Sequence, residues 1–370
     1  MIPNNTYSSW LEIDLNAIEH NTKRMLAISG VDVMAVVKAN GYGHGAVPVA
    51  RASLKAGASW CGVGRIEEAI ELRKNGINSP ILLMGFTPFE QFELAITNNV
   101  SLTLWDIDQL KYASVKAQKL GQTAKIHLKV DTGMGRLGIR TEEVIPLSEN
   151  LVKMPGIYYE GIFTHFARAE EQDSTFTVKQ EQEFDRIITS LIEKGISPPI
   201  IHSANSAAGL TRPSYRTNLV RAGIAIYGLN PSPDCRLPAD FRPALNWKSV
   251  LSQVKVLPAG HGLSYGHTYV TKKNEKIGTI PVGYADGFRR THNNQVVIRG
   301  CKVPVVGSVC MDQSLVQLDQ VPEAKVGDEV VLIGSQGEAS ITAEELARYW
   351  GTINYEVICG LGSRMPRLYI

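Results

Sequence analysis

The first two thirds of the chain alternate short apolar runs with longer amphipathic segments. Segments such as Arg65–Asn75 and Gln180–Lys194 carry apolar residues at helical spacing. Strands that alternate with such helices lie parallel and are joined by crossover helices. The apolar runs predict buried strands at Val33–Lys38, Trp60–Gly64, Pro80–Met84, Val100–Leu104, Ala124–Val130, Glu160–His165, Pro199–Ser203 and Leu219–Gly223. Such a series favours a closed α/β fold, a (β/α)8 TIM-type barrel, over an open doubly wound sheet.

The pattern changes after Gly228. Residues 229–243 read LNPSPDCRLPADFRP, which is rich in proline and aperiodic and indicates a linker. Beyond it, short strands are predicted at Leu245–Leu257, Lys276–Val282, Gln295–Ile298, Val303–Val306, Ser314–Leu318 and Glu329–Leu332. One helix, Thr342–Trp350, follows a capping position near Ser340. We therefore predict a barrel domain over residues 1–235 and a predominantly β domain over residues 236–370, and residues 1 to about 12 could pack with the second domain.

Composition narrows the functional classes. The 370 residues are 44% hydrophobic and 20% charged, with a net charge of +2, so no electrostatic footprint for nucleic acid or an anionic membrane is expected. The five cysteines form no CxxC pair, which argues against a disulfide framework or a zinc site and for a reducing compartment. Neither a signal peptide nor a membrane-spanning apolar run is recognised. We expect a cytoplasmic protein without a metal.

Polar groups follow the predicted strands of the barrel at one end. Taken singly, each could be an ordinary core histidine, surface cation or helix cap. In such barrels the active site lies at the carboxyl ends of the strands, so these groups should converge. They are Lys38 after the first run, Arg136 in the loop after the fifth, His165 after the sixth, Ser203 after the seventh, and Arg221, Gly223 and Ile224 at the eighth.

The chemistry of these groups suggests a cofactor. A desolvated lysine loses its proton and forms Schiff bases, although Lys38 could also simply reach solvent or a carboxylate. Backbone N–H groups in the last βα loops of a barrel form a usual phosphate site. Here they would come from Gly223 and Ile224, with hydroxyls from Tyr42 and Ser203. A strand-end lysine beside a phosphate cradle points to pyridoxal 5'-phosphate.

Arg221 would face the pyridine nitrogen of that cofactor. Arginine keeps its proton in proteins, so it can donate a hydrogen bond to the ring nitrogen but does not readily protonate it. The resulting electron sink is weaker than one made by a carboxylate. A weaker sink favours plain proton transfer at the α-carbon over side reactions.

With these residues the chain closely resembles the bacterial alanine racemases over nearly its whole length. The motifs that carry the resemblance are AVVKANGYGHG (35–45), KVDTGMGRLG (129–138), THFA (164–167), SANSAA (203–208), VRAGIAIYG (220–228), LSYGHTY (263–269), GYADG (283–287), GSVCMDQS (307–314) and INYE (353–356). The resemblance implies a barrel followed by a β domain, pyridoxal phosphate as cofactor, and a homodimer with shared active sites. It also implies interconversion of L- and D-alanine, which supplies D-alanine for peptidoglycan.

The resemblance further assigns roles to single residues. Lys38 would hold the cofactor and act as base on one face of the substrate, and Tyr265 from the other subunit would be the base on the opposite face. Cofactor contacts would come from Tyr42, Arg136, His165, Ser203, Arg221, Gly223, Ile224 and Tyr355. Substrate contacts would come from Arg136, Met311 and Tyr284. Lys129 matches a position that is carbamylated in several family members, where it orients the residue matched by Arg136.

Two positions depart from the family pattern, and other readings stay open. Glu170 stands where an aspartate is common, and Ser308 where some members carry a cation; both positions belong to the outer access path. A racemase of broader or serine preference is one alternative, although Tyr355 favours alanine. A related amino-acid decarboxylase is another, disfavoured by Arg221. A cofactor-homeostasis protein would be a single barrel, which the β domain disfavours.

Overall fold

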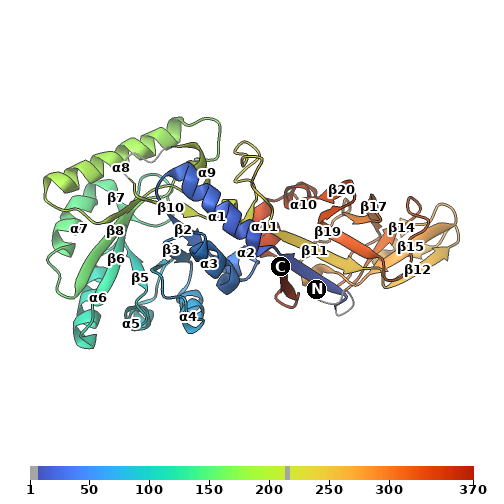
Figure 1. Ribbon diagram of the computed structural model, residues 1–370, viewed down its shortest axis with the longest axis horizontal. Coiled ribbons are helices and arrows are strands. Elements are labelled where there is room, and N and C mark those ends of the chain that lie inside the picture. Colours follow the sequence, from blue (N-terminus) through green and yellow to red (C-terminus); the bar gives the residue numbers. More distant parts are fainter. Residues whose placement is uncertain (1–6, 213–216) are drawn as a thin grey trace. The chain divides into compact units, whose positions relative to one another are not determined.

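The computed structural model describes residues 7–212 and 217–370 and divides the chain into two compact units (Figure 1). The barrel unit is Asn16–Pro243. The β unit joins the segment that ends at Leu15 to Ala244–Ile370. The division after Pro243 lies closer to the C-terminus than the boundary predicted after residue 235, because the proline-rich segment belongs to the barrel unit.

The barrel unit contains a parallel sheet in the order β10-β2-β3-β4-β5-β6-β8-β9. Its strands are β2 (Asp32–Val36), β3 (Trp60–Val63), β4 (Ile81–Leu83), β5 (Ser101–Leu104), β6 (Ala124–Asp131), β8 (Ile157–Phe163), β9 (Ile200–His202) and β10 (Leu219–Ala222), and the short β7 (Ile139–Arg140) pairs with β6. The two ends of the sheet meet through Asn218 N–H to Ile201 O, 2.9 Å, and Arg221 N–H to Ala204 O, 3.1 Å. The predicted eight-stranded barrel is confirmed, nearly closed.

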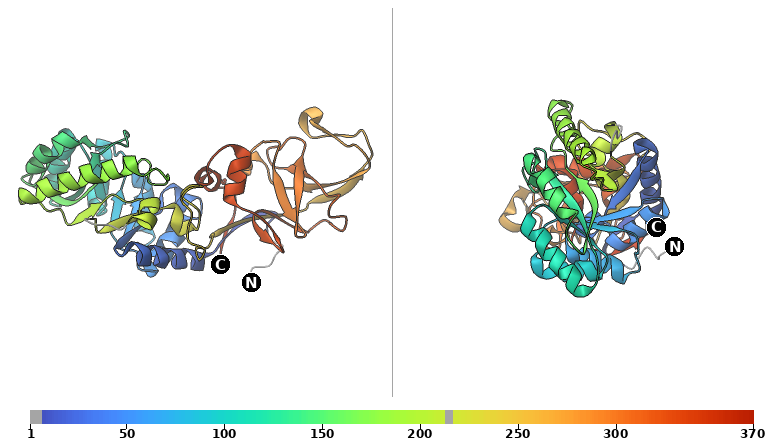
Figure 2. Two further views of the ribbon diagram at one scale, coloured as in Figure 1. Left: turned by 90° about the horizontal axis from the view of Figure 1, so that it is seen from above. Right: turned by 90° about the vertical axis from the view of Figure 1, so that its left-hand side faces the viewer.

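Helices surround the strands of this unit (Figure 2, right). They are α1 (Leu15–Ser29), α2 (Lys38–Tyr42), α3 (Ala46–Lys55), α4 (Ile66–Lys74), α5 (Phe92–Thr97), α6 (Ile107–Leu120), α7 (Val144–Leu151), α8 (Thr175–Glu193) and α9 (Ser206–Thr211). Helix α8 begins earlier than predicted but buries the predicted apolar face, which includes Phe184, Ile187 and Leu191. Three-residue and four-residue 3-10 turns complete the unit: η1 (Phe89–Gln91), η2 (Thr141–Glu143) and η3 (Ile224–Tyr227).

The β unit is built on one large sheet in the order β12-β15-β18-β17-β16-β19-β11-β1-β21. Its strands are β1 (Ser9–Ile13), β11 (Leu245–Val250), β12 (Gln253–Leu257), β15 (Glu275–Ile280), β16 (Gln295–Ile298), β17 (Cys301–Val306), β18 (Ser314–Gln317), β19 (Glu329–Gln336) and β21 (Arg367–Tyr369). Smaller elements are β13 (Gly262–Leu263), β14 (Tyr269–Val270), β20 (Ala339–Ile341), η4 (Tyr265–His267), η5 (Tyr284–Asp286), α10 (Ala343–Trp350) and α11 (Asn354–Cys359). The N-terminal strand β1 pairs with β11 and β21.

Two details of the β unit correct the sequence prediction. The strand predicted at Leu245–Leu257 is two strands, because the chain stops pairing with β1 and β19 at Val250 and pairs with β15 from Gln253 onward. The apolar alternation changes phase at Val250 and Leu251, which is the signal in the sequence that marks the break. The cap of α10 is Thr342, whose hydroxyl accepts the N–H of Glu345 at 3.1 Å, and not a residue near Ser340.

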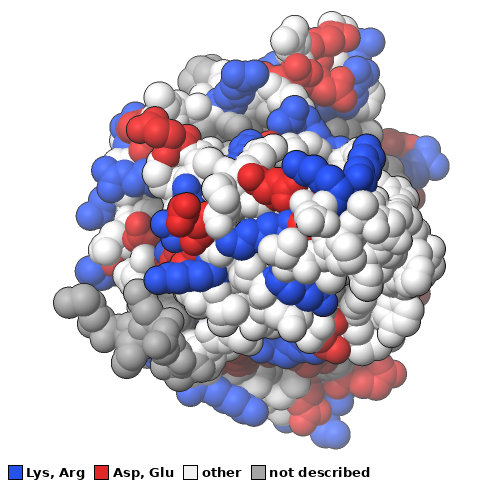
Figure 3. Space-filling model, turned by 90° about the vertical axis from the view of Figure 1, so that its right-hand side faces the viewer, with Lys and Arg blue, Asp and Glu red and all other residues white. Residues whose placement is uncertain are grey.

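The described residues also bear on membrane, metal and nucleic-acid binding. None of their helices is long and apolar enough to cross a membrane, and no three His, Cys, Asp or Glu side chains among them gather as a metal site requires. On the face drawn in Figure 3, Lys and Arg are interspersed with Asp and Glu. A mixed surface of this kind offers no broad basic patch on that face.

Candidate active site

Lys38 begins a left-handed turn at the mouth of the barrel. Strand β2 ends at Val36, so Lys38 lies just beyond the strand and not at its last position as predicted. The next four residues, 39–42, have φ between 50° and 59°, a conformation that costs L-residues roughly 1–2 kcal/mol each. Gly64, after β3, leaves room for the lysine, since a Cβ there would lie 3.6 Å from Lys38 Cβ. The backbone of this turn is thus locally strained, and the strained conformation places Lys38 at the mouth of the barrel.

Arg221 is the centre of the polar cluster in the barrel mouth. It lies on β10, is 4% exposed, and its Nη1 donates to His202 Nδ1 at 2.9 Å. Nη2 donates to Thr164 O, His165 Nδ1 and Ser203 O at 2.9, 3.0 and 2.8 Å. The structure therefore joins the predicted residues Arg221, His165 and Ser203. Burial lowers the pKa of Arg221 to about 9, with help from the charge of Arg136, so the guanidinium stays cationic at neutral pH.

Gly223 lies beside the hydroxyl of Tyr42. A Cβ at this glycine would lie 2.7 Å from Tyr42 Oη, so only glycine leaves the gap open. The Tyr42 ring stacks on Tyr227 with centroids 4.8 Å apart, which fixes the hydroxyl in place. The N–H of Gly223 donates to Ser206 Oγ at 2.9 Å. Ser206 was not predicted as a site residue, and its position in the SANSAA motif is the only signal that the sequence offered.

Lys129 lies on β6 beneath the loop that carries Arg136. Its Nζ donates to Val130 O at 2.9 Å and lies 5.1 Å from the centre of the Phe163 ring. Burial, and then the positive charge of Arg221, lower the pKa of Lys129 to about 7. A neutral amine is therefore present in quantity at physiological pH. The Arg136 side chain itself is exposed.

His165 is a neutral imidazole in this cluster. Burial and the neighbouring charge of Arg221 hold its pKa well below the usual range. Because Nδ1 accepts a hydrogen bond from Arg221, the ring proton must reside on Nε2. His165 therefore offers a hydrogen-bond donor from its far edge. The charge of Lys38 also contributes to the low pKa, which places Lys38 within electrostatic range of His165.

Tyr265 belongs to the β unit and is presented on a tight turn. Its side chain is 75% exposed, and its neighbours Ser264 and His267 have φ of 61° and 46°. The hydroxyl of Ser308 donates to Tyr265 O at 3.2 Å, and Ser264 Oγ donates to Ser308 O at 2.6 Å. Ser308, expected in the outer access path, is buried here and fixes the turn.

Met311 and Tyr284 are also exposed, by 54% and 48%. Their segments are pinned together, since Tyr284 N–H donates to Cys310 O and Ala285 N–H donates to Met311 O, both at 3.0 Å. Tyr355 lies in α11 and is partly buried. The predicted site residues thus fall into two sets: one converges in the barrel mouth, and Tyr265, Met311, Tyr284 and Tyr355 belong to the β unit.

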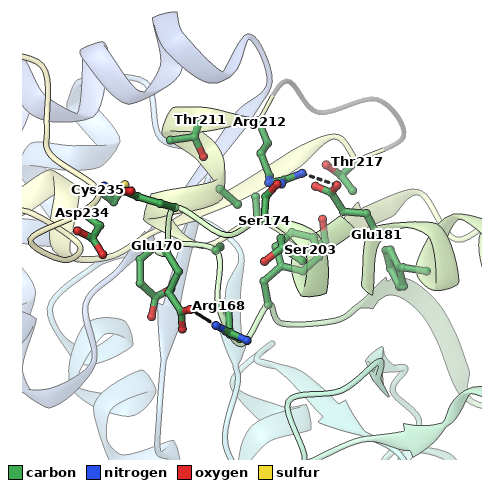
Figure 4. A pocket seen from close by; sticks show the side chains of 18 of the residues that line it. Arg168, Glu170, Ser174, Glu181, Ser203, Thr211, Arg212, Thr217, Asp234 and Cys235 are labelled. Carbon is green, nitrogen blue, oxygen red and sulfur yellow. Dashed lines mark hydrogen bonds and ion pairs between the residues drawn. The ribbon is translucent and has the colours of Figure 1, made fainter. Parts of the chain in front are cut away.

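A cavity of about 580 Å³ lies next to the cluster in the barrel unit (Figure 4). Ser203 lines both, whereas Lys38 and Arg221 do not line the cavity. Its rim holds charged pairs, including Arg212 Nη1 to Glu181 Oε2 at 2.6 Å. Glu170, the departure from the family pattern, also lines it. The cavity therefore neighbours the predicted site without containing its central residues.

Comparison with known proteins covers both units. Residues 13–231 match the model of the alanine racemase N-terminal domain, and residues 244–369 match that of the C-terminal domain. The alanine racemase of Symbiobacterium thermophilum is 46% identical over 364 residues, covering 98% of this chain and 97% of that protein. That of Halalkalibacterium halodurans is 45% identical over 370 residues, covering 98% and 95%.

Solved structures agree with the sequence relatives. The alanine racemase of Bacillus anthracis with bound L-Ala-P is 41% identical, with a TM-score of 0.93 and coverage of 98% of this chain and 95% of that chain. The alanine racemase of Clostridium difficile in complex with cycloserine is 40% identical, with a TM-score of 0.92 and coverage of 99% and 96%. Both unit folds and the full length are shared, and the chain belongs to the alanine racemase family.

Proposed function

We propose that this protein is an alanine racemase that interconverts L- and D-alanine with pyridoxal 5'-phosphate. The observation that carries the proposal is the buried Arg221 cluster beside Lys38 and Gly223, in a chain whose relatives are named alanine racemases. The B. anthracis relative binds L-Ala-P and the C. difficile relative binds cycloserine, so a ligand of amino-acid size suits this family.

The barrel mouth fits the cofactor. The gap at Gly223 is too narrow for a Cβ and lies beside the hydroxyl of Tyr42. The N–H groups of Gly223 and Ala225 converge there on Ser206 Oγ, at 2.9 and 3.4 Å, and donors that converge in this way suit a phosphate oxygen. Of the nitrogens of Arg221, Nη1 and Nη2 make the hydrogen bonds described above, and Nε takes part in none of them. The residues that would hold the cofactor are Lys38, Tyr42, Arg136, His165, Ser203, Arg221, Gly223, Ile224 and Tyr355. When bound, pyridoxal phosphate supplies an electron sink for negative charge at the substrate α-carbon.

Two bases on opposite faces account for racemisation. Lys38 Nζ would remove or return the α-proton on one face, and Oη of the partner subunit's Tyr265 would do so on the other. A single base could exchange the proton but would not readily invert the centre. Arg136 and the backbone of Met311 would bind the substrate carboxylate, and Tyr284 would line the access path.

A homodimer with shared sites follows from the exposed side chains of the β unit. Tyr265, Tyr284, Met311 and Ile353 are 75%, 48%, 54% and 61% exposed. Contacts with a second chain would remove these large side chains from water. A second copy of the chain that covers them would bring Tyr265 and Met311 to a neighbouring barrel.

The product would serve cell-wall synthesis in the cytoplasm, since D-alanine is a component of peptidoglycan. Alanine is preferred over serine in this proposal because Tyr355 is large where serine-preferring relatives carry a smaller residue. The decarboxylase alternative is weaker, because Arg221 stands where those enzymes place a carboxylate.

An assay of the purified protein on L-alanine and L-serine tests the proposal. We expect a yellow protein whose visible band disappears on borohydride reduction and in Lys38→Ala, and faster racemisation of alanine than of serine. A colourless protein that cannot be reconstituted with pyridoxal phosphate would overturn the cofactor assignment. A yellow protein that releases CO2 from an amino acid without racemising alanine would replace the racemase by the decarboxylase.

A further inference from the structure

A chain of polar side chains crosses the interior of the barrel from Arg221. Arg221 Nη1 lies 2.9 Å from His202 Nδ1, and His202 Nε2 lies 2.9 Å from His127 Nδ1. His127 Nε2 is 3.3 Å from Glu160 Oε2, an ion-pair contact looser than a good hydrogen bond. Ser101 Oγ donates to the same oxygen. These five residues lie on β10, β9, β6, β8 and β5, and all are at most 7% exposed.

The proton positions along this chain follow from its two ends. Arg221 can only donate, so His202 Nδ1 accepts and the proton of His202 resides on Nε2. His202 Nε2–H then donates to Nδ1 of His127, whose own proton must reside on Nε2. His127 Nε2 lies 3.3 Å from Glu160 Oε2, a carboxylate oxygen that can only accept, although the contact lacks the geometry of a hydrogen bond. One tautomer of each histidine is thus selected.

The charges of the chain agree with this assignment. Burial holds the pKa of His202 well below its usual range, with the charge of Arg221 adding to the effect, and burial also lowers the pKa of His127. Burial alone would raise the pKa of Glu160, but its contact with His127, its hydrogen bond from Ser101 and the charge of Lys125 outweigh this and lower it. Two neutral imidazoles therefore separate a buried cation, Arg221, from a buried anion, Glu160.

The backbone and the aromatic neighbours are shaped around the two imidazoles. A Cβ at Gly161 would lie 2.5 Å from the His127 ring, and the pairing of β6 with β8 shifts register between Ile126 and His127. His202 stacks on Phe163 with centroids 4.5 Å apart and planes 7° apart. The interior of such barrels is usually filled by apolar layers, and a buried charge pair is often no more stable than apolar side chains of the same volume. The polar chain therefore calls for a role other than stability.

We propose that Glu160 and His127 are positioning residues for the reaction, an inference that rests on the proposed racemase function. They hold His202 in the tautomer that accepts from Arg221, and so fix the guanidinium that would face the pyridine nitrogen of the cofactor. Neither residue would touch substrate or cofactor. Their effect would reach the reaction only through His202 and Arg221.

Glu160→Gln in the holoenzyme tests the charged end of the chain. We expect kcat to fall about tenfold, the lower range for loss of a partner behind a liganding group, with KM for alanine within about twofold of wild type. The 15N chemical shift of the ring nitrogen of bound 15N-labelled pyridoxal phosphate should move, because its hydrogen-bond donor is no longer held. Glu149→Gln is the matched control, since Glu149 pairs with Lys194 on the surface of the barrel unit at 2.9 Å, and it should leave all three quantities unchanged.

His127→Leu, alone and combined with Glu160→Gln, tests whether the residues act in series. His127→Leu removes the imidazole beside the buried Glu160, which keeps Ser101 and, at 3.9 Å, the partly exposed Lys125 as neighbours. It should still destabilise the protein, and the double variant should recover part of this loss because the buried charge is gone. The double variant should lose no more kcat than His127→Leu, as expected for one pathway. Additive losses in kcat, or a Glu160→Gln enzyme that is merely less stable with wild-type kcat and 15N shift, would overturn the inference. A wild-type protein without cofactor or racemase activity would instead overturn the proposed function.

Discussion

Arg221 in the barrel unit is 4% exposed and bonded to four acceptors, whereas Tyr265 in the β unit is 75% exposed and held only through its backbone turn. The barrel residues of the site are positioned by side chains from neighbouring strands. In the β unit, Tyr265, Tyr284 and Met311 are positioned by backbone turns and their side chains are largely exposed, whereas Tyr355 is partly buried in α11. Each proposed base is nevertheless flanked by left-handed residues, Ala39 after Lys38 and Ser264 before Tyr265.

Under the proposed function, this difference separates the site residues that one chain positions by itself from those that it would provide to a second chain. A pyridine-binding arginine must be desolvated and fixed before the cofactor arrives, so it is built inside the barrel. A base that serves a neighbouring subunit cannot be buried in its own chain, so only its backbone is fixed. Exposure of Tyr265 is thus a sign of its proposed function and not evidence against it.

The largest expected effect tests whether the exposed tyrosine serves another chain. Lys38→Ala and Tyr265→Phe should each lower racemisation by about 10³-fold, since each removes one of two essential bases. Coexpressed as a mixed population, they should recover about a quarter of the wild-type rate, because random pairing makes half of the dimers mixed and each mixed dimer has one intact site. Steady-state racemisation by the unselected mixture of coexpressed chains measures the recovery.

A mixture of Lys38→Ala chains with wild-type chains is the control for this coexpression experiment, and it calibrates how far the subunits exchange. If the two inactive variants form mixed dimers and no activity returns, each site uses Tyr265 of its own chain. That result would remove the contrast between the two units, since both bases would then be provided by one chain.

A smaller effect concerns the cost of keeping charges inside the barrel. Lys129 is 6% exposed and its pKa is lowered from 10.5 to about 7, mainly by burial. At pH 7 the unfolded chain binds this proton fully and the folded chain only in part, so the folded state is penalised. The penalty is largest at and below pH 7 and disappears as the pH rises through 10.5. Lys129→Met should therefore raise the free energy of unfolding at pH 7 by about 2 kcal/mol, after allowing for the lost bond to Val130 O.

Urea unfolding at pH 7 and pH 9, in buffer freed of dissolved CO2, measures this difference. Because the penalty falls by about 2 kcal/mol between pH 7 and pH 9, the methionine variant should lose most of its advantage over wild type at pH 9. An advantage that grows with pH would mean that Lys129 is stabilised as a cation. Repeating the wild-type measurement with bicarbonate would show whether the neutral amine is carbamylated, seen as added mass in the native protein.

The sequence predicted most of the strands of the barrel unit, and it predicted the strands of the β unit less completely. Apolar runs between helices revealed the eight strands of the barrel but not the two-residue β7, because buried parallel strands are apolar on both faces. Because parallel strands end on the same side of a sheet, the sequence also predicted that Lys38, His165, Ser203 and Arg221 lie at one end of the barrel. The left-handed turn after Lys38 was not predictable, because Ala39 has no sequence preference for that conformation.

The missed residues were those whose role depends on contacts across strands. His127 and Glu160 lie inside strand segments that read as ordinary apolar runs, and only the barrel closure brings them to His202. The split between β11 and β12 was missed although the apolar alternation changes phase at Val250 and Leu251, because no glycine or proline marks a turn there. Motif resemblance identified Tyr265 and Met311, whereas their exposure and the role of Ser308 required the structure.

The smallest expected effect tests whether the strain beside Lys38 is dispensable for folding. Ala39→Gly removes the Cβ that makes φ of 51° unfavourable, a gain of about 1–2 kcal/mol, but it also raises the entropy of the unfolded chain by about 0.5–1 kcal/mol. The free energy of unfolding should therefore rise by about 0.5 kcal/mol, seen as a higher urea midpoint at constant m-value. The backbone bond from Ala39 N–H to Glu68 Oε1 at 2.6 Å does not need the methyl group.

Lys119→Gly, on the exposed face of the right-handed α6, is the control and should instead lower the free energy of unfolding by about 1 kcal/mol. If Ala39→Gly is as destabilising as Lys119→Gly, the turn holds no strain. If it is stabilising but slows racemisation, the barrel half maintains a strained backbone to aim Lys38, as the β half does around Tyr265.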